Sequence, residues 1–159
     1  MAAALQPGDK APDFSLPSDE GGDIRLKDLA GRTVVLYFYP KDDTTGCTNE
    51  AKAFTSAAKD FASAGATIVG VSKDTVKSHG KFRQKYGLSV RLGADVEGET
   101  VERYGVWVEK SLYGRKYMGI ERATFLIDGS GVIRQVWRKV SVPGHAEAVL
   151  TAVRALKPA

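Results

Sequence analysis

The apolar residues of the chain are concentrated in a few short runs, and the densest run extends from Val34 to Tyr39. It consists of apolar and aromatic residues only and is β-branched at its start, which is typical of a strand buried on both faces. Similar runs from Ala66 to Ser72 and from Ala123 to Ile127 predict two more buried strands. After a glycine-rich turn, Val132 to Val136 is predicted to return as the hairpin partner of the last run.

Apolar residues at helical spacing predict four helices between and after these strands. One helix is predicted over residues 48–63, where Ala, Phe, Ala and Phe recur every three or four positions. A second is predicted from an N-cap at Asp74 through Tyr86, and a brief third from a cap at Asp95 through Tyr104. The last helix is predicted to follow Pro143, with a buried stripe of alanine, valine and leucine.

The remaining segments carry weaker patterns. Residues 14–16 and 24–26 alternate between apolar and polar residues around a turn, so they predict an N-terminal β-hairpin. Val90 to Leu92 predicts a short strand, and the stretch that begins at Val106 is predicted to be irregular. The order of strands and helices predicts an α/β fold with a mixed central β-sheet flanked by helices, in a single domain over residues 1–159.

Composition narrows the class of protein. The chain has 159 residues, of which 43% are hydrophobic and 26% are charged, as in an ordinary water-soluble globular protein. No apolar run approaches the ~20 residues that span a bilayer, so no membrane partner is expected. The N-terminal sequence MAAALQPGDK lacks the features of a signal peptide, and one cysteine allows no intrachain disulfide. These observations together predict a cytoplasmic protein.

The net charge of +4 is concentrated in one part of the chain, since residues 110–139 contain seven Lys or Arg and two acids. We interpret this excess as a solvated face, with a weak surface for anionic partners as the alternative. No nucleic-acid motif accompanies it, so no nucleic-acid partner is expected.

The single cysteine, Cys47, stands where the predicted strand 34–39 turns into the predicted helix. With Asp43 or Thr44 as the N-cap, Cys47 lies in the first turn, where free backbone N–H groups and the helix dipole stabilise a thiolate. A cysteine there is more nucleophilic than a free one. The alternative is a small apolar side chain that fills a gap in the core, and position alone leaves both interpretations open.

The motif Pro40-x-x-x-Thr44-x-x-Cys47 resembles the active-site signature of peroxiredoxins, which are thiol peroxidases on a thioredoxin-like fold. The sequences YFYPKDDTTGCTNEA and GVWVEKSLYGRKYMGIERATFLID are similar to the bacterioferritin-comigratory or PrxQ branch of this family. The resemblance extends from about Pro7 to about Leu156. It also implies an N-terminal extension in front of a thioredoxin-like core, and antioxidant defence in a bacterial cell.

The resemblance implies a role for each site residue. Cys47 would attack the peroxide, and Thr44 would donate a hydrogen bond from one side. Pro40 would close and shield the loop, because it is rigid and lacks an N–H group. Arg122 matches the arginine of the family's active site, although on sequence alone it is a strand-end arginine in a basic region. Glu50 would orient Arg122, with an exposed helix acid as the alternative interpretation.

Two positions depart from the branch. Thr45 replaces the usual proline of the loop. Many members also carry a resolving cysteine five residues after the reactive one or in the next helix, but this chain has Lys52 at the first position and no cysteine in residues 74–86. A one-cysteine mechanism is therefore implied, with a peroxide as substrate and an external thiol as reductant: thioredoxin, glutaredoxin or glutathione. A monomer is expected rather than a dimer.

No cofactor or metal is expected. His79 and His145 are the only histidines, and neither stands in a cluster with zinc-like spacing, so His79 is predicted to be a residue of a helix face. Two other classes of function remain as alternatives: a redox-inactive thioredoxin-like binding or holdase module, and a basic protein associated with nucleic acid. The absence of C-x-x-C argues against a dithiol oxidoreductase.

Overall fold

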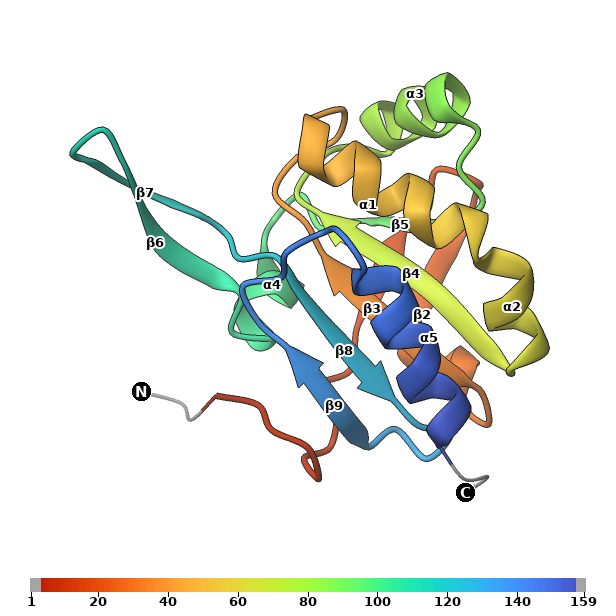
Figure 1. Ribbon diagram of the computed structural model, residues 1–159. Coiled ribbons are helices and arrows are strands. Elements are labelled where there is room, and N and C mark those ends of the chain that lie inside the picture. The colour runs from red at the N-terminus through yellow and green to blue at the C-terminus, as the bar shows by residue number, and fades with distance from the viewer. Residues whose placement is uncertain (1–3, 157–159) are drawn as a thin grey trace.

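The buried runs form the centre of a five-stranded sheet in the computed structural model, which describes residues 4–156 (Figure 1). Three adjacent strands of this sheet run parallel to one another, whereas each of the other two is antiparallel to its neighbours, so the sheet is mixed as predicted. Across the sheet the strands lie in the order β5 (Arg91–Ala94), β4 (Ala66–Ser72), β3 (Thr33–Phe38), β8 (Ala123–Ile127) and β9 (Ile133–Trp137).

Both faces of β3 are buried, in two separate cores. Alternate side chains point to opposite faces of a strand, so Val34, Leu36 and Phe38 enter one core, and Val35 and Tyr37 enter the other. Four helices cover the second face: α1 (Thr45–Ser56), α2 (Ala58–Ser63), α3 (Val76–Tyr86) and α5 (His145–Ala155). The predicted layer arrangement is therefore confirmed.

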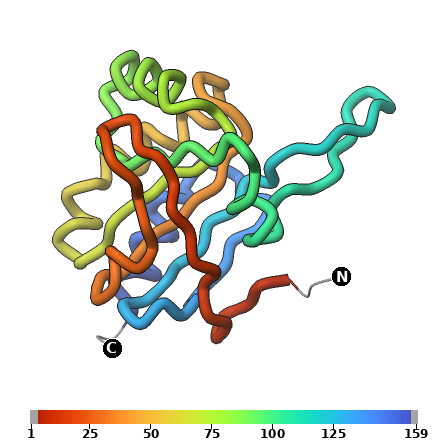
Figure 2. Tube along the Cα trace, turned by 180° about the vertical axis from the view of Figure 1, so that it is seen from behind, coloured from red at the N-terminus to blue at the C-terminus, as the bar shows by residue number. Residues whose placement is uncertain are grey.

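The first face is covered by the N-terminal part of the chain and one short helix. The predicted N-terminal hairpin is confirmed, and Figure 2 shows it lying across the back of the sheet. The elements on this side are β1 (Ser15–Pro17), β2 (Asp23–Arg25), the 3-10 helix η1 (Leu26–Leu29) and α4 (Glu99–Arg103). These elements contribute buried side chains to the first core, among them Leu16, Ile24, Leu29 and Val101.

The single helix predicted over residues 48–63 is wrong, because the chain forms two helices with a break at Ala57. The first helix also starts earlier, at Thr45. Phe54 and Phe61 are both fully buried although they lie in different helices. The helical spacing of apolar residues therefore continues across the one-residue break. For this reason the sequence pattern did not show that the helix is interrupted.

The irregular stretch predicted after Val106 is also wrong. It forms a hairpin of β6 (Trp107–Leu112) and β7 (Arg115–Ile120), which projects from the body as an arm (Figures 1 and 2). Most of its side chains are exposed on both sides, so they show no apolar alternation. Its two-residue turn is Tyr113-Gly114, both with positive φ, where Asn-Gly would have been the recognisable signal.

Two predicted helix caps need correction. Thr75, not Asp74, is the N-cap of α3, and its hydroxyl accepts a hydrogen bond from the Ser78 N–H. Gly98 occupies the N-cap position of α4, while the carboxylate of Asp95 accepts hydrogen bonds from two N–H groups of that helix. Asp95 thus performs the capping function from outside the helix.

No helix among residues 4–156 is long and apolar enough to cross a membrane. The expected lack of a signal peptide rests on the N-terminal sequence. Its first three residues, Met1 to Ala3, lie outside the described residues. The last three residues of the expected domain, 157–159, lie outside them too.

Candidate active site

Cys47 is the third residue of α1 and is 1% exposed. It is reached from the end of β3 through the active-site loop, residues 40–44, and Thr44 is the N-cap of the helix. The first turn of a helix has N–H groups without intrahelical partners, and the helix dipole places partial positive charge there. The Cys47 Sγ therefore lies where the start of the helix attracts negative charge.

Arg122 reaches Cys47 because of the strand order. β3 and β8 are antiparallel neighbours in which Phe38 faces Ala123, so the start of β8 lies beside the end of β3. The Nη2 of Arg122 lies 3.3 Å from the Cys47 Sγ. Gly46 permits this approach, since a Cβ on it would lie only 3.1 Å from that Nη2.

The same guanidinium also binds Glu50, one helical turn after Cys47. The Arg122 Nη1 lies 2.7 Å from Oε1 of Glu50, whose residue is 1% exposed, so the alternative of an exposed helix acid is wrong. Burial raises the pKa of Glu50 to about 7, although the positive charge of Arg122 opposes the rise. Burial lowers the pKa of Arg122, but Glu50 and Cys47 outweigh it and the net pKa is raised.

Thr44 and Pro40 lie in the active-site loop on either side of its turn. The hydroxyl of Thr44 donates to the Lys41 carbonyl at 2.8 Å, and its side chain makes no capping hydrogen bond. Its single proton is therefore engaged within the loop in this conformation. Pro40 is the second residue after β3 and is half-buried.

The contact between Asp42 and His79 could not be predicted from the sequence, because the two residues are 37 positions apart. His79 is fully buried on the inner side of α3, and its Nδ1 lies 2.7 Å from Asp42 Oδ2. Its Nε2 lies 3.1 Å from the Gly93 carbonyl, which only accepts. Both ring nitrogens thus face acceptors, and a doubly protonated imidazolium satisfies both. Burial lowers the pKa of His79, but the hydrogen bond and charge of Asp42 outweigh it and raise the pKa.

Asp42, Asp74 and His79 also form a group whose potential ligand atoms lie within 4.8 Å of one another. Each of these side chains already makes hydrogen bonds within the protein. Asp74 accepts from the Asp42 N–H at 2.8 Å and from the Ser72 hydroxyl at 2.6 Å. Tyr39 donates to the other oxygen of Asp42. The group is therefore a closed hydrogen-bond network that fixes the loop on β4 and α3, and the prediction that His79 is only a residue of a helix face missed this role.

A second tether acts one residue further along. Asp43 has a φ of 60°, a left-handed conformation that is unusual for a residue with a side chain. Its carboxylate accepts hydrogen bonds from Lys85, at 2.8 Å, and from the hydroxyl of Tyr86. Both donors lie at the end of α3, which Figure 1 shows beside the start of α1. Two successive aspartates thus hold the loop before Cys47 against one helix.

His145, the second histidine, has a different environment. It is the first residue of α5, and its Nε2 lies 2.8 Å from the Thr124 hydroxyl. Burial, together with the charge of Arg122, lowers the pKa of His145 to about 4. The imidazole is therefore neutral near pH 7.

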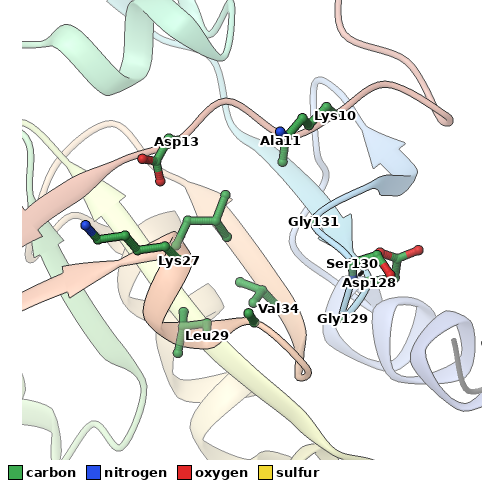
Figure 3. A pocket seen from close by; sticks show the side chains of 12 residues that line it. Lys10, Ala11, Asp13, Lys27, Leu29, Val34, Asp128, Gly129, Ser130 and Gly131 are labelled. Carbon is green, nitrogen blue, oxygen red and sulfur yellow. Dashed lines mark hydrogen bonds between the residues drawn. The ribbon is translucent and has the colours of Figure 1, made fainter.

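A separate cavity of about 330 Å³ lies away from this site (Figure 3). It is bounded by the N-terminal segment, η1 and the turn between β8 and β9. Val34, at the opposite end of β3 from Cys47, forms part of its wall. The cavity thus shares no lining residue with the cysteine–arginine pair.

Comparison with known proteins identifies the family. The model of the AhpC/TSA family matches residues 7–136. The Bacillus subtilis peroxiredoxin Bcp is 47% identical over 148 residues, which cover 92% of this chain and 94% of the relative. The Xanthomonas campestris peroxiredoxin Bcp is 45% identical over 147 residues, covering 91% and 92%.

Solved structures agree with this assignment. Xanthomonas campestris peroxiredoxin Q has a TM-score of 0.87 and 42% identity, covering 97% of each chain. A cysteine-to-serine mutant of Xylella fastidiosa PrxQ has a TM-score of 0.91 and 37% identity, covering 97% of this chain and 98% of that one. The predicted thioredoxin-like fold is thereby confirmed. The chain therefore belongs to the AhpC/TSA family and, within it, to the Bcp or PrxQ peroxiredoxins, as a one-cysteine thiol peroxidase.

Proposed function

We propose that Cys47 is the nucleophile of this thiol peroxidase and Arg122 its activating cation. The 3.3 Å contact between the Arg122 Nη2 and the Cys47 Sγ, in the first turn of α1, carries this proposal. The thiolate attacks one peroxide oxygen, an S–O bond forms and the O–O bond breaks. The leaving alkoxide or hydroxide takes up a proton, and Cys47 becomes a sulfenic acid.

The other site residues act around this pair. Arg122 stabilises the thiolate and the negative charge that develops on the peroxide oxygens, because its planar guanidinium presents several donors in a fixed geometry. Glu50 holds the guanidinium in place. Thr44 turns its hydroxyl from the Lys41 carbonyl to the peroxide when substrate enters. Pro40 closes the loop and keeps water away from the sulfur.

The substrates are hydrogen peroxide and organic hydroperoxides. A solved structure 41% identical to this chain was described for its insights into the alkyl peroxide reduction activity of the Xanthomonas campestris bacterioferritin comigratory protein. That likeness supports organic substrates here. The protein works in the cytoplasm in antioxidant defence.

The sulfenic acid is resolved by an external thiol, either glutathione or the cysteine of a thioredoxin or glutaredoxin. The sequence contains one cysteine, so no second thiol within the chain can form the disulfide. The solved Xanthomonas campestris relatives include two different cysteine-to-serine mutants, so that protein has at least two cysteines. The buried Cys47 is poorly placed for the close approach that an intersubunit disulfide needs, which supports resolution by an external thiol and a protein that acts as a monomer.

A single substitution tests the nucleophile. Cys47→Ser should abolish peroxide consumption while circular dichroism and thermal unfolding stay close to those of the wild type, because the side chains differ little in size. Peroxide consumption per mole of protein, with dithiothreitol as reductant, is the measurement. Full activity in the variant would refute the nucleophile assignment, and a wild type that consumes no peroxide would favour the redox-inactive binding or holdase module.

A further inference from the structure

The exposed face of α3 carries a row of lysines beside the active-site loop. Lys77, Lys81 and Lys85 are spaced four residues apart, which places them on one side of the helix about 6 Å from one another. All three are exposed. Lys85 is tethered to Asp43, four residues before the reactive Cys47. The row therefore starts at the active-site loop and extends away from it along the helix.

These lysines line a cavity of about 530 Å³, large enough for a molecule of tripeptide size. Its wall consists of side chains from the loop and from α3: Asp42, Asp43, Thr75, Lys77, Ser78, Lys81, Phe82 and Lys85.

The two acids of this wall do not neutralise the whole row. The carboxylate of Asp42 is buried and points inward to Tyr39, Ser78 and His79. Asp43 is occupied by Lys85. Among residues 4–156, Lys77 and Lys81 have no carboxylate within ion-pair distance, so two uncompensated positive charges face the cavity.

Positive charge continues from the cavity towards the helix of Cys47. The Lys52 Nζ lies 5.9 Å from the centre of the Tyr86 ring, and the Tyr86 hydroxyl binds Asp43. Lys52 belongs to α1, five residues after Cys47. A ligand that is held by its anionic groups at Lys77 and Lys81 would thus lie along the edge of the active-site loop.

We propose that this cavity binds the carboxylates of a small anionic thiol of glutathione-like chemistry, which reduces the Cys47 sulfenic acid. The inference rests on the proposed function, because it assigns the site at which the external thiol docks. A compact thiol with two carboxylates matches two free lysines next to a loop that has to loosen before the buried sulfur can be attacked. Exposed lysines attract such an anion from solution and lengthen its stay near the loop.

The recycling reaction balances with this thiol as the only reductant. Its thiolate attacks the Cys47 sulfur, an S–S bond forms, the S–O bond breaks, and hydroxide leaves and is protonated to water. A second thiolate then attacks the sulfur of the bound thiol. The S–S bond breaks, Cys47 leaves as a thiolate, and the two small thiols depart as their disulfide.

A binding experiment tests the cavity without any turnover. S-methylglutathione, which has the carboxylates but no free thiol, is titrated into the Cys47→Ser protein and followed by nuclear magnetic resonance of the backbone amides. We expect shifts in residues 42–43 and 75–85, and a Kd about fivefold weaker in the same protein carrying Lys77→Gln and Lys81→Gln, as expected for the loss of two exposed ion pairs. The matched control is Lys10→Gln with Lys27→Gln, which removes two exposed lysines from the remote cavity.

A kinetic experiment then tests the function of the cavity. The rate at which glutathione reduces the sulfenic acid is divided by the rate with neutral 2-mercaptoethanol, for each protein. We expect this ratio to fall about fivefold in the Lys77→Gln, Lys81→Gln protein and to decline with added salt in the wild type, but to be unchanged in the Lys10→Gln, Lys27→Gln control.

The outcomes separate this inference from the proposed function. If peroxide adds no oxygen to Cys47, the proposed function fails, whatever S-methylglutathione does. If the sulfenic acid forms but neither binding nor the ratio responds to Lys77 and Lys81, the anionic-thiol site is refuted and the peroxidase stands. If only reduction by a thioredoxin depends on these lysines, a protein partner uses the surface and the inference is also wrong.

Discussion

At the scale of single residues, one guanidinium contacts both the sulfur of Cys47 and the buried carboxyl of Glu50. Cys47 and Glu50 lie one turn apart on α1, and Arg122 reaches Cys47 with Nη2 and Glu50 with Nη1. Only a planar, forked side chain can make both contacts at once without moving. The proposed activation of the sulfur therefore depends on the shape of the arginine as well as on its charge.

Replacing Arg122 by lysine should separate shape from charge. Arg122→Lys keeps the positive charge but loses one of the two contacts, so the peroxide step should slow by about 10²–10³, the effect of losing one transition-state donor at roughly 2.7–4 kcal/mol. Single-turnover oxidation of the protein by hydrogen peroxide is the measurement. Arg115→Lys, on the exposed arm, is the control. Rates like the wild type in both Arg122→Lys and Arg122→Ala would leave Arg122 with a purely structural role.

Glu50 should make stability depend on pH. Its pKa in the folded protein is raised to about 7 from an ordinary value of 4.5. Between these values the folded state holds a proton that the unfolded state lacks, so the stabilisation is present below pH 4.5 and is lost as the pH rises through 7. In Glu50→Gln, which is neutral throughout, this loss should be missing. The wild type should therefore lose up to roughly 3 kcal/mol relative to the variant between pH 4.5 and 8.

Urea unfolding at several pH values from 4.5 to 8 measures this difference. The exposed Glu97→Gln variant is the control and should follow the wild type. Parallel pH profiles for the wild type and Glu50→Gln would show that Glu50 titrates normally in the folded protein.

At the scale of elements, α3 holds the loop that positions Cys47. Asp42 binds His79 in the first turn of the helix, and Asp43 binds Lys85 and Tyr86 at its end. The inner contact is a buried charged pair, whereas the outer one is exposed to solvent and weaker. The proposed opening of the loop for an external thiol should therefore break the outer contact before the inner one.

The inner contact should be lost at alkaline pH. The pKa of His79 is raised above its ordinary 6.5, so the folded state keeps an extra proton above that value. This stabilisation is present below pH 6.5 and is lost as the pH rises through the folded pKa. In Asp42→Asn the free energy of unfolding should not fall in this pH range, because the amide can donate to the neutral Nδ1 of His79 while its Nε2–H still donates to the Gly93 carbonyl. The substitution should cost about 1–3 kcal/mol at pH 6.

Urea unfolding between pH 6 and 9 compares the wild type with Asp42→Asn, and the exposed Asp60→Asn serves as a control. A wild-type free energy of unfolding that does not fall above pH 6.5 would contradict a charged His79. A decline of equal size in Asp42→Asn would assign the pH dependence to another group.

At the scale of the whole molecule, the protein is a thiol peroxidase with one cysteine, enclosed by a fold that buries it. The helices α1, α2, α3 and α5 cover one face of the sheet, and Cys47 lies at the edge of that layer. An oxidised Cys47 has no thiol partner in its own chain. Reduction of an oxidised Cys47 therefore requires a thiol from another molecule.

The intact mass of the protein after treatment with hydrogen peroxide should show which product Cys47 forms. With one equivalent of hydrogen peroxide and no reductant, we expect a monomer one oxygen heavier, and excess peroxide should add further oxygen. Adding a small thiol should convert the first product into a mixed disulfide. A covalent dimer as the main product would contradict resolution by an external thiol.

The central strands, the α/β class and the place of Cys47 at a strand-to-helix turn were predictable from the sequence alone. These follow from local spacing, because burial on both faces demands continuous apolar runs and helices repeat every three to four residues. The motif around Pro40, Thr44 and Cys47 also pointed to the family. Each of these signals lies within a short stretch of chain, where periodicity and residue type are sufficient.

The contacts between segments that are distant in the sequence became visible only in the three-dimensional fold. Arg122 lies 75 residues after Cys47 and reaches it because β8 pairs with β3. Asp42 and His79 are 37 residues apart, and only the packing of α3 against the loop shows that the histidine is buried against a carboxylate. The β6–β7 arm was missed because exposed strands bury no alternating face. Contacts between distant segments are set by the whole arrangement of sheet and helices, so local patterns could not specify them.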